Sequence, residues 1–278
     1  MHPVPGPPQP GLGPSAELLA VGALAYDAIA ASYDAQVQGD NWMREVLHRH
    51  YARVFRAGQH VLDIGCGTGI DAVFLARRGV RVTGIDHSPE MIAELRNKVA
   101  ASGVSDLIDV QVLAIQDLPR LRQQRFDGMI SAFASLSTLP DLRQFAECAA
   151  QLVKPGGRLV LHLLNRFSLW EWLGYLSHAD WSAARQVGRL RTREFTIGGH
   201  AVRHTLYFPR EAYERFFKDR FAMRSVYGLG SLRPPHTVQR IPTRIVRLLE
   251  RLDVRTGHWP LVHNAGRFFV LDLERLPT

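Results

Sequence analysis

At 278 residues the chain can bury the core of one large domain, and its 46% apolar and 22% charged residues are ordinary for a globular protein. Two cysteines, Cys66 and Cys148, exclude a disulfide framework and a cysteine-rich metal site, and they favour a reducing, cytoplasmic location. No stretch approaches the ~18 consecutive apolar residues of a membrane span. The apolar run Leu18 to Tyr26 lacks the preceding basic residues of a signal peptide. The histidines show no metal spacing, since His48 and His50 lie two apart on an expected helix and face different sides.

The charge is unevenly distributed along the chain. Residues 1–164 carry 15 Lys and Arg against 16 Asp and Glu, whereas residues 165–278 carry 19 against 10. Almost all of the cations are arginines, because Lys98, Lys154 and Lys218 are the only lysines. A basic C-terminal part is compatible with a nucleic acid or another anionic partner, but a compositional bias without a partner gives the same count.

In chain order, residues 1–14 contain six prolines and predict a disordered tail. The pattern from Ser15 to about Arg56 is helical, with Ser15 as N-cap and Gly58 as stop. Strand and helix patterns then alternate, which predicts a parallel sheet with helices on both faces. The expected strands are His60–Ile64, Val80–Ile85, Asp109–Leu113, Gly128–Ala132 and Arg158–Leu163, and the expected helices are Ile70–Arg78, Pro89–Ala101 and Leu142–Val153.

Beyond Asn165 the alternation ends, and residues 166–188 are rich in aromatic side chains. The stretch LRTREFTIGGHAVRHTLYF then predicts a hairpin that turns at Gly198 and Gly199. Counting residues back from the turn assigns the paired side chains to the two faces of the hairpin. The first face pairs Glu194 with Arg203 and Thr192 with Thr205, and the second pairs Phe195 with Val202 and Arg193 with His204.

The C-terminal part returns to regular elements. Pro209 is expected to open a helix that ends near Lys218, and a strand follows at about Ala222–Tyr227. After a proline-rich loop we expect a last helix over Pro242–Leu252 and a final strand over Arg267–Asp272.

The stretch VLDIGCGTGIDAVFLA, residues 61–76, joins an apolar strand to a helical pattern through three glycines. Such a turn lets a ligand approach the backbone, and its open N–H groups favour polar or anionic atoms. The dinucleotide fingerprint G-x-G-x-x-G would need glycine at position 70, where this chain has Ile70. The pattern DIGCGTG, residues 63–69, instead resembles the first motif of the class I S-adenosylmethionine-dependent methyltransferases.

Further motifs extend this resemblance over residues 26–164. VTGIDHSPEM places Asp86 at the end of the second strand, where the family binds the two ribose hydroxyls, and one carboxylate can accept both protons. LVKPGGRLVL, before the fifth strand, and FDGMISAFASLSTL also resemble the family. YDAIAASYD resembles an N-terminal helix of small-molecule members such as the quinone-biosynthesis methyltransferases, in which Tyr33 would lie over the cofactor.

The resemblance implies an α/β fold, with a Rossmann-like, mostly parallel seven-stranded sheet, helices on both faces, an N-terminal helical segment and a C-terminal cap insertion. It also implies S-adenosylmethionine as cofactor. One position departs from the family pattern, because Ala114 in AIQDLP stands where an acid usually meets the adenine. The expected cofactor-binding residues are Tyr33, Asp63, Gly65, Cys66, Gly67, Gly69, Asp86, His87, Met91, Ile115, Gln116, Asp117 and Ala132.

We expect the chain to divide into five segments. The division gives the tail 1–14, an N-terminal helical cap 15–56, a cofactor-binding core 57–164, a cap insertion with the hairpin 165–208, and core elements 209–278 that include a further cap loop 230–262.

Methyl transfer needs an acceptor held in line with the departing sulfur, so positioning supplies most of the acceleration. A base is needed only if the acceptor must lose a proton, and the candidates are His162 and His204, with a core role as the alternative for His162. The aromatic and arginine-rich cap predicts a medium-sized, partly hydrophobic acceptor that carries an acidic group. Trp170 and Tyr175 would form its apolar wall, and Arg193 would bind the anion if its hairpin face turns inward; packing in the core is the alternative for the aromatic cluster.

Three functions compete at this point. A small-molecule methyltransferase is favoured, and a nucleic-acid methyltransferase is the second possibility because the C-terminal part is basic. The Asn/Asp-Pro-Pro-aromatic motif typical of exocyclic amino methylation is missing, however, where SAFASLSTLPDL stands. A cofactor-binding subunit without catalysis is the third, because binding and turnover are separable. The oligomeric state and the acceptor stay open.

Overall fold

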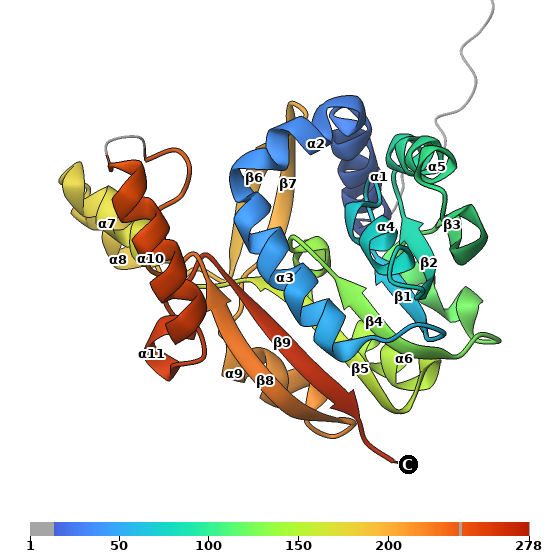
Figure 1. Cartoon of the computed structure of the whole chain (residues 1–278). Helices are drawn as coiled ribbons and strands as arrows, with labels where there is room; N and C mark the ends of the chain where they lie inside the picture. Colours follow the sequence, from blue (N-terminus) through green and yellow to red (C-terminus); the bar gives the residue numbers. More distant parts are fainter. Residues whose placement is uncertain (1–13, 239–240, 278) are drawn as a thin grey trace, which may run out of the picture.

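The computed structural model describes residues 14–238 and 241–277. The expected proline-rich tail therefore lies outside the described residues, apart from Pro14, with which the first helix begins. A seven-stranded sheet forms the centre of the structure, and helices cover both of its faces (Figure 1).

The strand order in this sheet is β3-β2-β1-β4-β5-β9-β8. Neighbouring strands are parallel except at β9, which runs antiparallel to both β5 and β8. The expected mostly parallel, seven-stranded Rossmann-like sheet is thus confirmed. Its strands are β1 (His60–Ile64), β2 (Arg81–Asp86), β3 (Ile108–Val112), β4 (Phe126–Ser131), β5 (Val153–Leu164), β8 (Phe221–Leu229) and β9 (Phe268–Arg275).

The helices of the core begin and end at local signals in the sequence. Before α5, Ser88 accepts a hydrogen bond from the Met91 N–H, Pro89 occupies the first position, and Gly103 ends the helix in a left-handed conformation. The α-helices are α1 (Pro14–Asp27), α2 (Tyr33–Gln36), α3 (Asn41–Val54), α4 (Ile70–Ala76), α5 (Pro89–Ser102), α6 (Arg143–Leu152), α7 (Leu169–Ser177), α8 (Trp181–Gln186), α9 (Pro209–Ala212), α10 (Thr243–Thr256) and α11 (Pro260–His263).

The alternation of side chains along β1 separates two cores. Leu62 and Ile64 pack into the cluster that contains α6, whereas Val61 packs into the cluster formed by Leu47 and Tyr51 of α3. Asp63 alternates with Leu62 and Ile64, so it lies on the same side of the sheet as α3. The N-terminal helical segment is therefore part of the structure that surrounds the strand ends.

A separate two-stranded sheet consists of β6 (Thr192–Ile197) and β7 (His200–Thr205). The register predicted from the turn is confirmed at all four pairs, including Glu194 with Arg203 and Arg193 with His204. The turn glycine Gly198 has φ of +54°, and a Cβ there would lie 2.3 Å from the Ala25 carbonyl oxygen. Glycine is thus required where the hairpin packs on α1.

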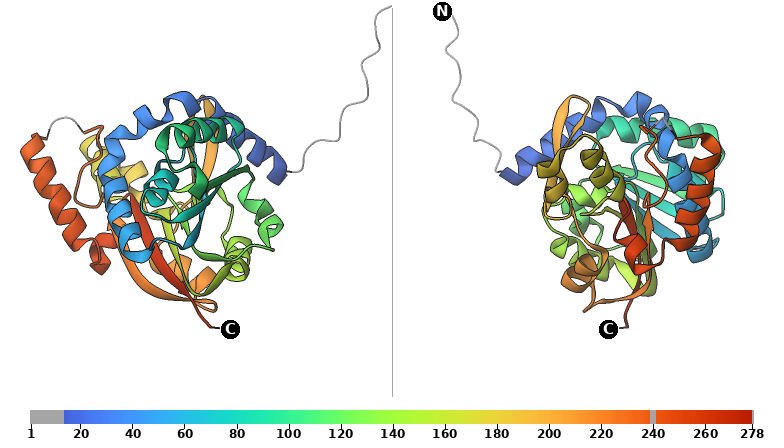
Figure 2. Two further views of the ribbon diagram at one scale, coloured as in Figure 1. Left: turned by 45° about the vertical axis from the view of Figure 1, so that its right-hand side comes forward. Right: turned by 90° about the vertical axis from the view of Figure 1, so that its left-hand side faces the viewer.

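Helices α7, α8, α10 and α11 form a lobe beside the β8–β9 edge of the sheet, which we call the C-terminal lobe (Figures 1 and 2). In the part of the chain that the structure describes, no helix combines the length and apolarity needed to cross a bilayer. The same residues contain no group of three or more His, Cys, Asp or Glu arranged to hold a metal ion.

Three expectations differ from the structure in detail. The helical pattern of residues 15–56 is broken into α1, α2 and α3, with 3₁₀ turns over Ala30–Ser32 and Val37–Asp40 between them. The helix expected from Pro209 to Lys218 continues beyond α9 as a π-helical turn over Tyr213–Phe217. Strand β5 begins at Val153, five residues earlier than expected.

Candidate active site

The glycine loop follows β1 at the carboxyl edge of the parallel strands. Gly65, Gly67 and Gly69 all have positive φ, between 52° and 78°. A Cβ on Gly67 would meet only the Met91 sulfur and the Tyr33 ring, each at 4.0 Å, so the backbone there is open. Gly65 and Gly69 are closed in by Ser135 and Leu95, because a Cβ would lie 2.4 Å and 1.8 Å from their side chains.

Asp86, the last residue of β2, lies directly beside this loop. One of its carboxylate oxygens accepts a hydrogen bond from the Gly67 N–H at 2.9 Å, and the other accepts one from the Ser88 N–H at 3.0 Å. These bonds fix the position of the carboxylate while each oxygen keeps a lone pair for a ligand.

A narrow cavity of about 50 Å³ opens between the glycine loop, the end of β2 and the N-terminal segment. One wall is polar, with Asp86 and His87, and another is apolar, with Met91, Leu113 and Ile115. Its remaining lining residues are Tyr26, Tyr33, Gly65, Gly67, Phe133, Ser135 and Thr138.

The segment 20–36 covers this cavity and is held to the core by two carboxylates. Asp27 accepts hydrogen bonds from the Ser88 hydroxyl and the Glu90 N–H. Asp34 accepts one from the Thr68 hydroxyl and pairs with Lys98 at 2.6 Å. Because Tyr26 and Tyr33 lie on this segment, its position sets the width of the cavity.

A buried charge cluster lies behind the loop. Arg44 of α3 pairs with Asp71, which also bonds His48 at 2.7 Å, and the Arg44 guanidinium lies over the Phe133 ring. Burial raises the pKa of Asp71, but Arg44 and His48 outweigh it and leave the pKa below its usual value.

The pKa of Asp63 is shifted in the opposite direction. Burial, reinforced by the nearby Asp71 and Asp86, raises its pKa well above the usual value. One of its oxygens is buried without a partner, although unpaired buried carboxylate oxygens are costly. The raised pKa favours the protonated carboxyl, whose burial costs less than that of an unpaired charge.

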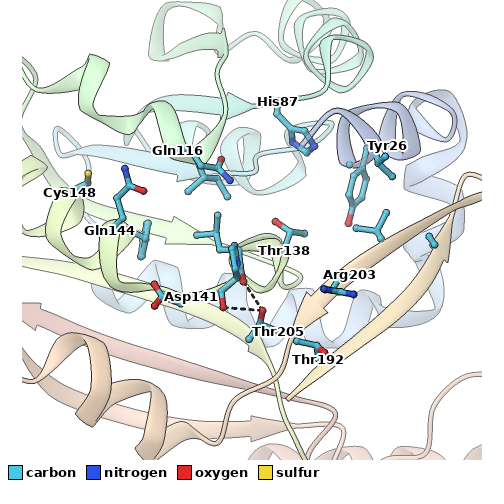
Figure 3. A pocket seen from close by; sticks show the side chains of 18 of the residues that line it. Tyr26, His87, Gln116, Thr138, Asp141, Gln144, Cys148, Thr192, Arg203 and Thr205 are labelled. Atoms are coloured by element: carbon cyan, nitrogen blue, oxygen red, sulfur yellow. Dashed lines mark hydrogen bonds between the residues drawn. The ribbon is translucent and has the colours of Figure 1, made fainter. Parts of the chain in front are cut away.

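A second, larger cavity of about 650 Å³ adjoins the first, and its size is typical of small-molecule sites. Figure 3 shows Gln116, Gln144 and Asp141 on one side of it and Arg203 and Thr205 of the hairpin on the other. Thr205 is held in place because its hydroxyl donates to the Leu139 carbonyl at 2.7 Å.

Four residues line both cavities, namely Tyr26, His87, Ile115 and Thr138. Nδ1 of His87 lies 3.4 Å from an Asp86 oxygen, and the ring also bonds the Gly22 carbonyl. Burial by itself lowers the His87 pKa, but these partners raise it above the usual value. The two cavities therefore meet at polar groups with fixed positions.

The comparisons with known proteins agree with this geometry. A family model described as a methyltransferase domain matches residues 61–157. The demethylmenaquinone methyltransferase of Symbiobacterium thermophilum is 33% identical over 209 residues, which cover 69% of this chain and 80% of that protein. The chain belongs to the class I S-adenosylmethionine-dependent methyltransferases.

Two further similarities cover a part of the sequence and the fold, respectively. A ubiquinone biosynthesis O-methyltransferase of Xylella fastidiosa is 40% identical over 114 residues, but the match covers only 41% of this chain and 45% of that protein. The structure of the CcbJ methyltransferase from Streptomyces caelestis has a TM-score of 0.61 at 19% identity and covers 92% of this chain and 99% of that one. The last similarity concerns the fold alone.

The smaller cavity of the methyltransferase has the chemistry that its family's cofactor requires. Asp86 offers acceptors for two ribose hydroxyls, and Met91, Leu113 and Ile115 offer apolar contact for a ring.

The structure brings most of the expected cofactor-binding residues to the cavities. Seven line the smaller one, and Gln116 lines the larger one. The other five line neither cavity, namely Asp63, Cys66, Gly69, Asp117 and Ala132. The seven are Tyr33, Gly65, Gly67, Asp86, His87, Met91 and Ile115.

Of the five residues outside the cavities, Asp63 is buried near Asp71 and Arg44, and the other four have structural contacts instead. Cys66 is buried behind the loop, where burial raises the pKa of its thiol, and Gly69 is packed against Leu95. Asp117 lies on the surface beside Arg120, and Ala132 is buried with its carbonyl accepting from the Ser135 hydroxyl. Cys66 and Gly69 were expected because they belong to the glycine motif, and Asp117 because it stands in the stretch AIQDLP, which resembles the family's adenine-binding pattern.

The two candidate bases line neither cavity. His162 is fully buried, its Nδ1 accepts a hydrogen bond from the Phe133 N–H, and burial lowers its pKa to about 3. His204 is also buried, bonds the Val202 carbonyl, and has a lowered pKa for the same reason. These positions are those of core histidines, the alternative considered for His162.

The expected acceptor wall is also placed differently. Arg193 pairs with Glu171 of α7 at 2.5 Å, and Trp170 donates to the Leu232 carbonyl; neither they nor Tyr175 line a cavity. The opposite face of the hairpin, with Thr192, Arg203 and Thr205, lines the larger cavity. The Arg193 face does turn toward the protein, since Val202 and His204 on the same face are buried. Arg193 itself is nevertheless held by Glu171 and lines neither cavity, so the structure does not place it beside a bound anion.

Sequence reasoning missed several cavity residues. Tyr26 opens the quoted YDAIAASYD stretch, seven positions before Tyr33, and this spacing would place both near one side of a helix. Thr138 and Asp141 stand in the quoted SAFASLSTLPDL stretch without a motif of their own. Arg44 had no local signal, because its partner Asp71 is 27 residues away.

Proposed function

We propose that this methyltransferase binds S-adenosylmethionine in the smaller cavity and methylates a small, partly hydrophobic acceptor in the larger one. The observation that carries the proposal is the junction of the two cavities at Tyr26, His87 and Thr138. A methyl group can pass between two ligands only where their sites meet. The bound cofactor would supply an electrophilic methyl group on a positively charged sulfur.

The residues of the smaller cavity would each have a defined task. Asp86 would accept the two ribose hydroxyls, since its carboxylate is already held by the Gly67 and Ser88 N–H groups. Gly67 would allow close approach to the backbone, and Tyr33 would cover the ligand. Because the cavity holds only about 50 Å³, we expect segment 20–36, which lines it through Tyr26 and Tyr33, to move outward when the ligand enters.

The larger cavity supports an acceptor with both apolar and anionic parts. Leu139, Phe145 and Ile115 would contact the apolar part. Arg203 and Arg215 also line the cavity, and a guanidinium suits a carboxylate or phosphate. The relatives named for demethylmenaquinone and ubiquinone biosynthesis support a ring compound with an apolar part as the acceptor class.

Isothermal calorimetry with S-adenosylmethionine and its demethylated product tests the proposal. Asp86→Ala should weaken binding by about 1.5–3 kcal/mol for each charge-assisted hydrogen bond lost, which is roughly tenfold or more in Kd. The matched control is Asp117→Ala, which removes a carboxylate outside both cavities and should leave Kd unchanged. Equal affinities of Asp86→Ala and the wild type would refute the assignment of Asp86.

Two outcomes separate this function from its alternatives. The first is methyl transfer to a small acceptor found in a pool of pathway intermediates. If a variant that still binds the cofactor loses this activity, the protein is not a binding subunit without catalysis. A nucleic-acid methyltransferase would instead lose affinity for its substrate steeply with salt, through many arginines at once.

A further inference from the structure

Helix α10 exposes an apolar face that no core contact explains. Ile245, Leu248 and Leu252 recur at intervals of three and four residues, so they form one stripe along the helix. Trp259 and Leu261 continue it beyond the helix end. These five side chains have exposed fractions of 47%, 56%, 40%, 62% and 87%, and we call them the apolar stripe.

A row of arginines runs beside the apolar stripe. Arg244, Arg247, Arg251 and Arg255 also repeat every three or four residues and are exposed. Within the described residues none of the four makes an ion pair. The acids of the helix are turned away, because Glu250 pairs with Arg233 and Asp253 is fully buried.

Asp253 fixes which side of α10 faces solvent. Its carboxylate accepts hydrogen bonds from the N–H groups of Gly230, Ser231 and Leu232 at 2.8–3.0 Å. With this residue anchored beneath the helix, the apolar stripe and the arginine row point outward. Both therefore belong to the folded protein's surface. Helix α10 itself lies at the outer side of the C-terminal lobe in the left view of Figure 2.

We propose that this face docks on the surface of an anionic lipid bilayer. The arginines would meet the lipid phosphates, while the apolar stripe would enter the boundary between headgroups and acyl chains. A tryptophan at the end of the stripe suits this boundary, because its ring is apolar and its N–H is polar. With 14 residues and about 1.5 Å of rise per residue, α10 lies along such a surface and is too short to cross it.

The charge pattern favours a bilayer over other occupants. A second copy of the chain packed on the same face would bring two arginine rows together without compensating acids, and like charges at an interface are destabilising. A nucleic acid would use the arginines but would leave the leucines and Trp259 unpaired. Of these three occupants, an anionic bilayer is the one that offers phosphates to the arginine row and an apolar interior to the apolar stripe.

Co-sedimentation of the full chain with unilamellar vesicles tests the proposal. Vesicles of equal parts phosphatidylglycerol and phosphatidylcholine should bind the protein, and pure phosphatidylcholine vesicles should bind it much more weakly. Arg247→Gln with Arg251→Gln should reduce partitioning roughly tenfold or more, because each cation near such a surface contributes about 1 kcal/mol. Raising the salt from ~0.1 M to ~1 M should have a similar effect, since the Debye length falls from ~10 Å to ~3 Å.

A second variant isolates the apolar stripe. Leu248→Ser with Leu252→Ser should also weaken binding, whereas Arg77→Gln with Arg78→Gln, two exposed arginines after α4, should not. Circular dichroism establishes that each variant is folded. Absence of binding to the anionic vesicles, or binding that both α10 variants retain, would overturn the proposal. A dimer that only the leucine variant abolishes, or binding to duplex DNA that does not depend on the leucines, would overturn it as well.

Discussion

Asp141 is the only carboxylate among the described residues that line the larger cavity. One of its oxygens accepts a hydrogen bond from the Arg143 N–H at 2.9 Å, which orients the side chain and leaves its other oxygen available. His162 and His204 lie outside the cavity, and the raised pKa of His87, which also lines it, favours the protonated ring. We therefore assign proton acceptance to Asp141 if the acceptor loses a proton.

Asp141→Asn should therefore lower kcat by about 10²-fold while KM changes little, because the amide keeps the shape but cannot accept a proton. Steady-state kinetics with the acceptor found by screening measure this difference. The control is Gln144→Ala, a neighbouring cavity residue without an ionisable group, which should affect KM more than kcat. A kcat of Asp141→Asn equal to that of the wild type would exclude Asp141 as the base.

Arg203 and Arg193 provide a matched pair on one hairpin. Arg203 lines the larger cavity with a side chain more than half exposed, and Arg193 is held by Glu171 outside it. Arg203→Ala should raise KM for a carboxylate acceptor roughly threefold to tenfold, a value reduced by solvent screening. Arg193→Ala should leave KM unchanged. If the methyl ester of the same acceptor shows the same loss with Arg203→Ala, charge recognition is not the cause.

Among the residues that line the smaller cavity, the sequence predicted those that belong to a contiguous motif. Asp86, Gly65 and Gly67 follow strand ends, and the carboxyl ends of parallel strands meet at one edge of a sheet. Arg44 and Asp71 escaped prediction because their contact joins α3 to α4 across 27 positions. For His162 the sequence left two roles open, because its place near a strand end does not reveal whether the ring points to the site. The ring lies in the core beside Phe133 and Phe268, which is the core role that was considered for it.

The N-terminal segment covers the smaller cavity and is joined to the end of β2 through His87. His87 lines both cavities and bonds Asp86 on one side and the Gly22 carbonyl of α1 on the other. Its raised pKa means that folding favours the protonated ring. This contribution to stability is fully present below the unfolded-state value of about 6.5 and is lost as pH rises through the folded-state pKa.

The unfolding free energy lost in His87→Gln should accordingly be largest near pH ~5.5 and should shrink toward pH ~8. Urea denaturation of both proteins at several pH values measures it. Gln116→Ala is the control, because it changes a cavity side chain without removing a group that titrates in this range. A difference that stays constant or grows with pH would contradict the protonated His87 contact.

The hairpin shows how far an element can be predicted. Gly198 and Gly199 determine the turn, and the turn determines the register, so all four predicted pairs are present. The side that faces the cavity depends on tertiary contacts, with Gly198 against α1 and Arg193 against Glu171. No local pattern encodes those contacts, since their partners lie on α1 and α7.

In the molecule as a whole, different parts of the chain form the two cavities. The glycine loop, β2 and segment 20–36 form the smaller cavity, while the hairpin and the residues around Asp141 form most of the larger one. The C-terminal lobe takes no part in either cavity. Part of the arginine excess seen in residues 165–278 lies there, in the row on α10.

We propose that the glycine loop, the end of β2 and the N-terminal segment form one cofactor site. Hydrogen exchange of the full chain, with and without S-adenosylhomocysteine, tests it without knowledge of the acceptor. We expect slower exchange over residues 20–36, 63–69 and 84–91 when the ligand is bound, and no change over residues 243–256 of α10. Unchanged exchange in these three segments at saturating ligand, or protection confined to the C-terminal lobe, would show that they do not form the cofactor site.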